Sequence, residues 1–252
     1  MTHLKRLPAS LLCLLASAVL ASSAFAITDA LTDDPIAQML AKRLERRGLD
    51  EVDVRVNGST AVLLGTVDTL RHRDEAERVA SSFEEIESVD NQIELVSNDR
   101  VQADIVADVS RKLSNPTWHT VFDWIEAEVE GSAVRLHGAV TMPWKEQSAI
   151  RAMQSIPGVD SVMSTIEVLP VSIHDDQIRQ RAYEAIYGDL SFAEYANRLE
   201  PPIHIVVDQG DVRLEGSVRN RAEKMLARSL VSSSALAFDI ENNLQTSTDQ
   251  PR

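Results

Sequence analysis

The chain has 252 residues, with 25 basic and 39 acidic side chains and a formal net charge of −14 at pH 7. This charge disfavours sequence-independent attraction to nucleic acid and loose adsorption to anionic lipid. The single cysteine, Cys13, lies in an apolar stretch near the N-terminus. The remainder of the chain therefore has no disulfide and depends on apolar cores for its stability.

The first 26 residues have the pattern of a secretory signal peptide. Lys5 and Arg6 precede the apolar stretch, and Ala24-Phe25-Ala26 provides a small-x-small cleavage site. The apolar stretch is shorter than the roughly 20 residues of a membrane span. Cys13 lacks the context of a lipoprotein signal, so we expect no lipid anchor. The pattern predicts a soluble periplasmic protein that begins near Ile27.

One short pattern of alternating apolar residues around a glycine occurs three times. The copies are Ala61-x-Leu63-x-Gly65-x-Val67, Val134-x-Leu136-x-Gly138-x-Val140 and Val212-x-Leu214-x-Gly216-x-Val218. At a constant distance after each glycine comes a second box, which reads Val89-x-Asn91-x-Ile93, Val162-x-Ser164-x-Ile166 and Ile240-x-Asn242-x-Leu244. Agreement of both spacings in three copies predicts a tandem array of one small module.

Each copy predicts the order helix, strand, strand, helix, strand. Apolar residues four apart mark the first helices: Ile36, Leu40, Leu44; Ile105, Val109, Leu113; and Ile178, Ala182, Ile186. The pairs before them are typical of helix starts: Asp33-Asp34, Asn98-Asp99 and Asp175-Asp176. The second helices are predicted around residues 73–83, 145–154 and 221–230.

A tight turn is expected between the first two strands of each copy. Asn57-Gly58 suits a two-residue hairpin turn, and Gly131 has the same offset in the second copy. Gln209-Gly210 is displaced by one position, which predicts a different turn in the third copy. The repeated glycines Gly65, Gly138 and Gly216 are expected to let the following helix approach the backbone closely.

These elements predict an α+β fold of three α-β-β-α-β modules, each a small mixed sheet packed on two helices. The predicted boundaries are 30–98, 99–171 and 172–245, followed by a polar, disordered tail at 246–252. The linkers between modules are short, so we expect neighbouring modules to touch.

The order of elements and the two boxes resemble the BON domain, a family named for bacterial osmotically inducible and nodulation proteins. In that resemblance Gly65, Gly138, Gly216, Asn91 and Asn242 are structural motif positions. The sequence departs from the family pattern at Ser164 and in a long loop of the third copy. The resemblance implies an exported α/β binding module, linked to envelope integrity and osmotic stress, that in some proteins binds phospholipid. It supplies no catalytic residue.

The residues themselves also offer no catalytic site. The histidines occupy unrelated module positions, and no nucleophile motif, phosphate-binding loop or metal-ligand spacing is present. We therefore expect no enzyme activity, cofactor, metal or nucleic-acid partner, and no small-molecule substrate is identified.

A few large side chains are candidates for contact with lipid or a partner: Trp118, Met142, Trp144, Phe192 and Tyr195. Tryptophan and tyrosine combine an apolar body with a polar tip, which suits a membrane interface. The alternative is that they pack against a neighbouring module. For function, the leading expectation is a periplasmic protein of envelope maintenance or stress that binds phospholipid or envelope surfaces. The alternative is a protein-interaction module or holdase-like chaperone for exported proteins.

Overall fold

The computed structural model describes residues 34–96, 102–114, 120–198 and 200–246. The chain forms two compact units: residues up to Thr66 with Glu75–Glu94, and Val67–Asp74 with the chain from Leu95 onward. The predicted signal peptide, Asn98-Asp99 and residues 247–252 of the predicted tail lie outside the described residues. In the described ranges, no helix is both long and apolar enough to cross a membrane.

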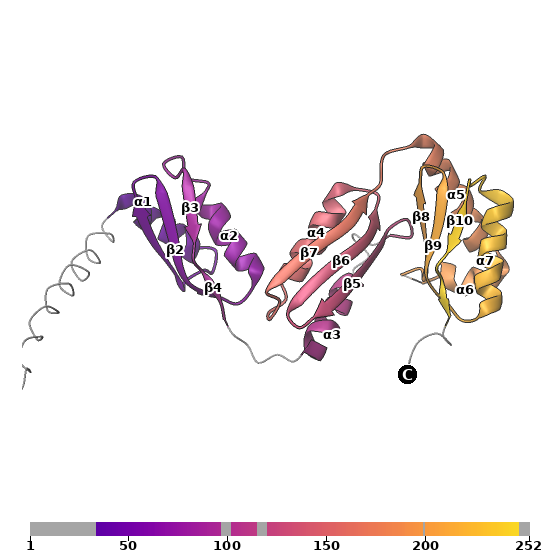
Figure 1. The fold of residues 1–252 in the computed structure, drawn as a ribbon, viewed down its shortest axis with the longest axis horizontal. Coiled ribbons are helices and arrows are strands. Elements are labelled where there is room, and N and C mark those ends of the chain that lie inside the picture. Colours follow the sequence, from indigo (N-terminus) through magenta and orange to yellow (C-terminus); the bar gives the residue numbers. More distant parts are fainter. Residues whose placement is uncertain (1–33, 97–101, 115–119, 199, 247–252) are drawn as a thin grey trace, which may run out of the picture. The chain divides into compact units, whose positions relative to one another are not determined.

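The sequence helix, strand, strand, helix, strand occurs three times, and we refer to the first, middle and third modules (Figure 1). The first contains α1 (Pro35–Glu45), β1 (Val52–Asn57), β2 (Thr60–Val67), α2 (Leu70–Ala80), β3 (Ser88–Asn91) and β4 (Glu94–Leu95). The middle contains α3 (Gln102–Leu113), β5 (Trp124–Glu130), β6 (Ala133–Val140), α4 (Pro143–Gln154) and β7 (Ser161–Val168). The third contains α5 (Ile173–Tyr187), η1 (Leu190–Phe192), α6 (Ala193–Ala196), β8 (Ile203–Asp208), β9 (Asp211–Val218), α7 (Arg221–Ser234), β10 (Ile240–Asn242) and β11 (Gln245–Thr246).

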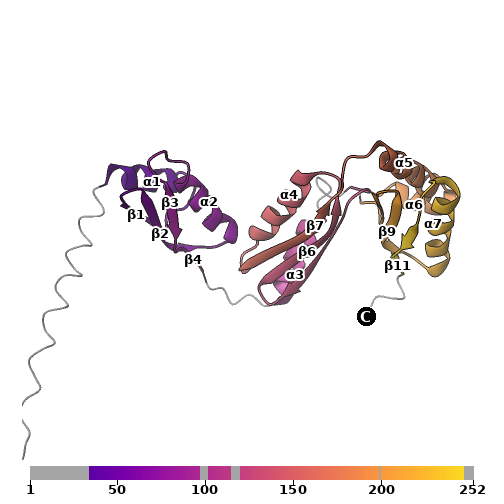
Figure 2. The same cartoon turned by 45° about the horizontal axis from the view of Figure 1, so that its top comes forward.

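Each module has its own sheet, with its second strand at the centre. The central strands β2, β6 and β9 pair antiparallel with the preceding strand and parallel with a following one. The two main helices of each module lie on one face of its sheet (Figures 1 and 2). This arrangement confirms the predicted α+β fold class and the mixed sheets.

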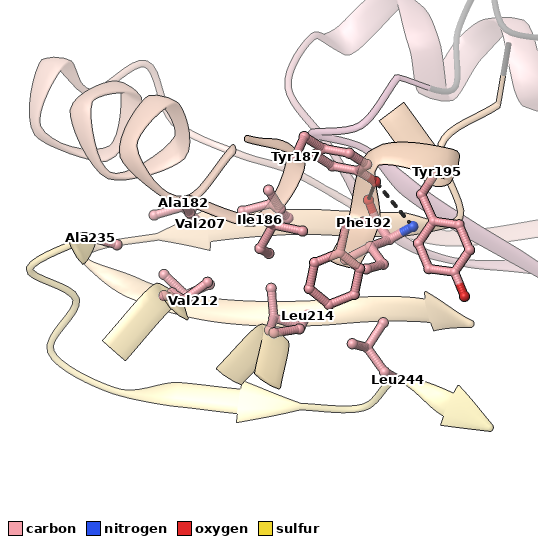
Figure 3. Packing of buried hydrophobic residues seen from close by; sticks show 14 of the residues in the cluster. Ala182, Ile186, Tyr187, Phe192, Tyr195, Val207, Val212, Leu214, Ala235 and Leu244 are labelled. Atoms are coloured by element: carbon pink, nitrogen blue, oxygen red, sulfur yellow. Dashed lines mark hydrogen bonds between the residues drawn. The ribbon is translucent and has the colours of Figure 1, made fainter. Parts of the chain in front are cut away.

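The cores form where the predicted helix faces meet the sheets. Leu40 and Leu44 of α1, Ile105 and Val109 of α3, and Ile178, Ala182 and Ile186 of α5 are all buried, as their spacing predicted. Burial alternates strictly along β1, so one face of its sheet is covered and the other faces solvent. In the third module, Ile186 and Phe192 pack with Leu214 of the sheet (Figure 3).

The helix starts agree with the sequence for α1 but not for α5. Asp34 accepts a hydrogen bond from the Ile36 amide at 2.7 Å, with Pro35 in the first turn. For α5 the predicted acidic pair is not the cap, because Ser172 takes that position. Asp175 is instead buried and accepts a hydrogen bond from the Gly210 amide at 2.9 Å. This carboxylate therefore ties the start of α5 to the β8–β9 turn.

The hairpin turns differ as predicted, but their central residues are shifted in the first copy. Asn57 pairs with Thr60, so Gly58 and Ser59 form the turn, with φ +63° at Gly58. A positive φ at the first central residue only is the pattern of a type II′ turn. In the third module Gln209 has φ +50° and Gly210 φ +90°, and two positive angles are the pattern of a type I′ turn.

The repeated glycines have a different cause from the predicted one. Gly65, Gly138 and Gly216 have φ of +110°, +130° and +104°, and each lies opposite the start of the preceding strand. An added Cβ would lie 2.0, 2.0 and 2.1 Å from the carbonyl oxygens of Glu51, Trp124 and Pro202. The preceding strand and the backbone angle, and not the following helix, therefore require glycine.

The asparagine of the second box fastens the last strand at its end. Asn91 and Asn242 each accept a hydrogen bond from the amide two residues later, at 3.2 and 3.3 Å. Each also donates to the second helix, to Glu77 in α2 and to the Lys224 carbonyl in α7. Both strands break after the asparagine, whereas β7 continues through Ser164 to Val168. The departure at Ser164 thus coincides with a longer, unbroken strand.

Candidate binding surface at the junction of the middle and third modules

The middle and third modules share a junction in which β8 meets the loop before β5. The Ile205 amide donates to the Val121 carbonyl at 2.8 Å, in the manner of a strand ladder. The His204 ring bonds the Thr120 carbonyl through Nδ1 at 3.0 Å and lies 5.0 Å from the Trp124 ring, centroid to centroid. These contacts join the loop before β5, in the middle module, to the edge strand β8 of the third module.

A small apolar cluster adds to this junction. Val206 of β8 packs with Ala139 and Leu169 of the middle module, and half-buried Trp124 lies against them. The rings of Phe122 and Tyr183 meet edge to face, with their centroids 6.1 Å apart. The expectation that neighbouring modules touch is confirmed for this pair.

A buried ion pair holds the loop that forms the junction. Asp123 is fully buried and pairs with Lys145 of α4 at 2.6 Å. It also accepts hydrogen bonds from the backbone amides of Thr120 and Thr141, at 3.0 and 2.8 Å. Burial alone would raise the pKa of Asp123, but the bonds from Lys145, Thr120 and Thr141 outweigh it and hold that pKa below its ordinary value.

Beside this network lies an open groove of about 340 Å³. Its walls come from the β6–α4 connection, the linker and α5: Phe122, Thr141, Met142, Leu169, Pro170, Val171, Asp176, Arg179 and Gln180. Arg179 is nearly buried, and its guanidinium donates to Asp176 and to the Val207 carbonyl, both at 2.6 Å. The groove therefore has several apolar residues in its wall, together with the Arg179 guanidinium, which its hydrogen bonds hold in place.

Exposed apolar side chains lie on the groove wall and at neighbouring chain positions. Met142 and Trp144, two of the predicted contact residues, are each 48% exposed. Val171 on the groove wall is 91% exposed, and Ile173 at the start of α5 is 79% exposed. Phe238 extends this surface, because its ring lies 5.9 Å from that of His174. We call Met142, Trp144, Val171, Ile173 and Phe238 the junction surface.

The other predicted contact residues are not part of this surface. Trp118 lies outside the described residues. Phe192 and Tyr195 are 0% and 2% exposed, because η1 and α6 turn them into the core of the third module (Figure 3). The Tyr195 hydroxyl donates to Glu223 of α7 at 2.7 Å. This burial excludes Phe192 and Tyr195 as surface contacts in the folded protein.

Some of the surface residues that we did not predict are recognisable in the sequence. Val171 and Ile173 are apolar residues in a short segment that we interpreted as a linker, and such exposure is unusual for valine and isoleucine. Phe238 follows α7 without any periodic pattern, so nothing in the sequence marks it. Asp123 and Lys145 are ordinary charges in the sequence, and only the fold brings them together.

The described residues contain no group of three or more histidine, cysteine or acidic side chains placed to hold a metal ion. The side chain of His137 is part-exposed and contacts Glu126 at 3.0 Å. His204 is buried at the junction, where its ring bonds the Thr120 carbonyl and so contributes to the packing of the two modules.

The chain is similar to the following solved structures at low identity. It has 12% identity and a TM-score of 0.25 to CdsD, a structural protein of the type III secretion system of Chlamydia trachomatis, covering 83% of this chain and 92% of that one. It has 14% identity and a TM-score of 0.20 to the periplasmic domain of the inner membrane protein PrgH from S. typhimurium, covering 81% and 99%. These scores carry no functional argument. None of the curated proteins matches the chain.

The family comparison is more specific. The model of the BON domain matches residues 32–97 and 174–248, which together are more than half of the chain. These segments contain the first and third modules, while the middle module, with the same order of elements, lies between them. The BON domain is a non-catalytic, binding-type domain associated with the bacterial envelope. The chain belongs to the BON domain family.

Proposed function

We propose that this protein acts without catalysis in the periplasm, in cell-envelope maintenance or osmotic and envelope stress, by binding phospholipid or envelope surfaces through the junction surface. The observation that supports this most is the exposure of Met142 and Val171 on the wall of one groove, together with that of Trp144 and Ile173, two residues further along the chain in each case. Such a grouping of large apolar side chains on a water-facing surface is typical of an interaction site.

The charge of the chain limits how such a surface can work. A net charge of −14 repels anionic headgroups, so at the junction surface the attraction must come from burial of apolar side chains. Trp144 suits this role because its ring has an apolar body and a polar N–H. Binding through this surface should weaken little as salt is added, and it should strengthen where salt screens the repulsion.

Vesicle flotation of the mature chain tests the proposal. Trp144→Ala combined with Ile173→Ser should reduce association with phosphatidylcholine and phosphatidylglycerol vesicles by about tenfold or more, because two apolar groups no longer insert. The control is Leu190→Ser, because Leu190 is 92% exposed and follows the far end of α5, a 15-residue helix about 22 Å long that begins at Ile173. Equal binding by the double variant and the parent would contradict the proposal.

The same variants distinguish lipid binding from the alternative function, a holdase-like chaperone. A holdase-like chaperone would suppress aggregation of an unfolded exported protein through these apolar side chains, with no vesicle association. If the double variant loses aggregation suppression and the parent does not float with vesicles, the interaction partner is unfolded protein and not lipid.

A further inference from the structure

The helix pair of the first module forms a basic groove on this acidic chain. The groove has a volume of about 360 Å³ and is lined by Arg43, Arg46, Arg47, Glu75, Arg78, Val79 and Ser82. Four guanidinium groups and one carboxylate leave three positive charges in excess. We propose that this groove, and its counterpart in the middle module, bind a phosphate group.

The arginines are only partly neutralised. Glu75 accepts hydrogen bonds from Arg47 and Arg78, which hold its pKa below the ordinary value although burial opposes this. Arg43 donates to the Ser82 hydroxyl at 3.4 Å and stacks on the Phe83 ring, with 4.5 Å to its centroid. Arg46 donates through Nε to the Lys42 carbonyl. In the described part of the chain, neither Arg43 nor Arg46 forms an ion pair with a carboxylate.

The middle module repeats this arrangement between α3 and α4. Lys112 donates to the Ser155 hydroxyl at 3.1 Å, as Arg43 does to Ser82. The groove there is lined by Arg71 from α2 and by six residues of α3 and of the helix α4 and its C-cap: Arg111, Lys112, Ser148, Arg151, Ala152 and Ser155. Arg151 and Ser155 follow Gly138 at the same spacing at which Arg78 and Ser82 follow Gly65. Two cations and a serine therefore recur at equivalent positions.

The third module provides an internal contrast. At the positions of Arg78 and Ser82 it has Ser229 and Ser233, and Ala185 stands where α1 has Arg43. Cations in the last turn of a helix stabilise its dipole, which is one reason for Arg43 in α1. The same reason applies to Arg78 and Arg151, which lie in the last turns of α2 and α4. The dipole accounts for each cation separately, but not for cations of both helices lining one groove. Two helices of one module thus contribute cations to the same groove.

The chemistry of these groups suits a phosphate. A guanidinium presents parallel N–H donors that match two oxygens of one phosphate, and a lysine or serine adds single contacts to the remaining oxygens. The volume of about 360 Å³ also accommodates a phosphate with an organic substituent. The phosphate could belong to a lipid headgroup or to a soluble ion, and both sources offer the same oxygens.

The test uses the mature chain at low salt, with inorganic pyrophosphate as the soluble probe in calorimetric titration. Arg43→Gln with Arg46→Gln removes the two guanidiniums without carboxylate partners, and Lys112→Gln with Arg151→Gln alters the second groove. The charge-matched control is Arg221→Gln with Arg228→Gln, two exposed side chains of α7. We expect each groove variant to weaken its site by about tenfold or more, and the control to change little.

Vesicles identify the source of the phosphate. Phosphatidylcholine vesicles with phosphatidic acid present an exposed phosphomonoester, and vesicles with phosphatidylserine at equal surface charge present the same charge with phosphodiester groups only. Loss of pyrophosphate binding with unchanged vesicle binding would assign a soluble phosphate, and loss of both would assign a lipid headgroup. If the groove variants bind both probes like the parent, or the control loses as much, the inference is wrong. This binding should weaken steeply with salt, unlike binding through the junction surface, so the two proposals can fail separately.

Discussion

The middle and third modules place side chains of opposite charge at the same buried position of their second helix. Lys145 and Glu223 each occupy the third position of their second helix, at the same distance after the repeated glycine. In the middle module Lys145 pairs with buried Asp123. In the third, Glu223 accepts from the Tyr195 hydroxyl at 2.7 Å and from the Arg219 amide and Nε at 3.0 and 2.8 Å.

This difference shows which parts of the module are interchangeable. The backbone fixes the place where a long polar side chain enters the core, but the sign of its charge follows from its partners. Each network is complete within its own module, so substituting one member without the others leaves a buried polar group unpaired. The glycine before the helix, in contrast, has the same backbone cause in both modules.

The largest expected effect is in the middle module. Lys145→Met leaves the Asp123 carboxylate buried without its ion partner and should lower the free energy of unfolding by about 3–5 kcal/mol. Trp118, Trp124 and Trp144 are all in this module, so denaturation followed by tryptophan fluorescence reports on it. Asp123→Asn with Lys145→Met removes the buried charge and should recover part of the loss. A loss below about 1 kcal/mol in the single variant would contradict this account.

The glycines should respond alike in both modules. Gly138→Ala and Gly216→Ala each force a Cβ against a carbonyl oxygen and a side chain into a backbone angle that glycine alone adopts readily. We expect each to destabilise its module by about 2–4 kcal/mol. Urea unfolding gives the values, and Gly58→Ala, with open space around its Cβ, is the milder comparison. A large difference between the two alanine variants would mean that the shared geometry is not the cause.

A smaller loss is expected from the third network. Glu223→Gln keeps the shape and an acceptor but removes the charge that faces Tyr195 and Arg219. Because Arg219 is half-exposed, water screens part of this interaction, and the loss should be about 1–2 kcal/mol. Amide hydrogen exchange in α7 measures it. A loss as large as that of Lys145→Met would remove the distinction between the two networks.

The smallest effect concerns pH at the junction. Burial lowers the pKa of His204 below 6.5, although the Thr120 carbonyl and Asp123 oppose this shift. The stabilisation from neutral His204 is complete above 6.5 and is lost as the pH falls through the lower folded-state pKa, because the unfolded chain takes up the proton first. The Tm should therefore be lower at pH 5 than at pH 7.5, and His204→Gln should reduce the difference. An unchanged difference would exclude His204 as its source.

The repeated elements were predictable from the sequence because periodic burial determines them. Spacings of four placed Leu40, Val109 and Ile178 on buried helix faces, and alternation placed Leu63, Leu136 and Leu214 in the sheets. Met142 and Trp144 were found as exposed residues because they precede and enter α4 in a connection of the kind that faces solvent.

The remaining features depend on contacts distant in the sequence. Phe192 and Tyr195 lie in the insertion of the third module, where no periodicity distinguishes a loop from the short helices that bury them. The cause of the repeated glycines lies in the carbonyl of the preceding strand, and spacing alone does not identify that partner. The two basic grooves could likewise not be predicted from the sequence, because each combines residues from different helices.

The hydrogen bond between Ile205 and Val121 has a consequence for aggregation during synthesis of the chain. Strand β8 is an edge of its sheet, and an uncovered edge can recruit strands from other molecules. Its cover comes from the preceding module, which leaves the ribosome first. The protecting loop therefore exists before the strand that needs it, and a fragment beginning at Ser172 would lack this protection.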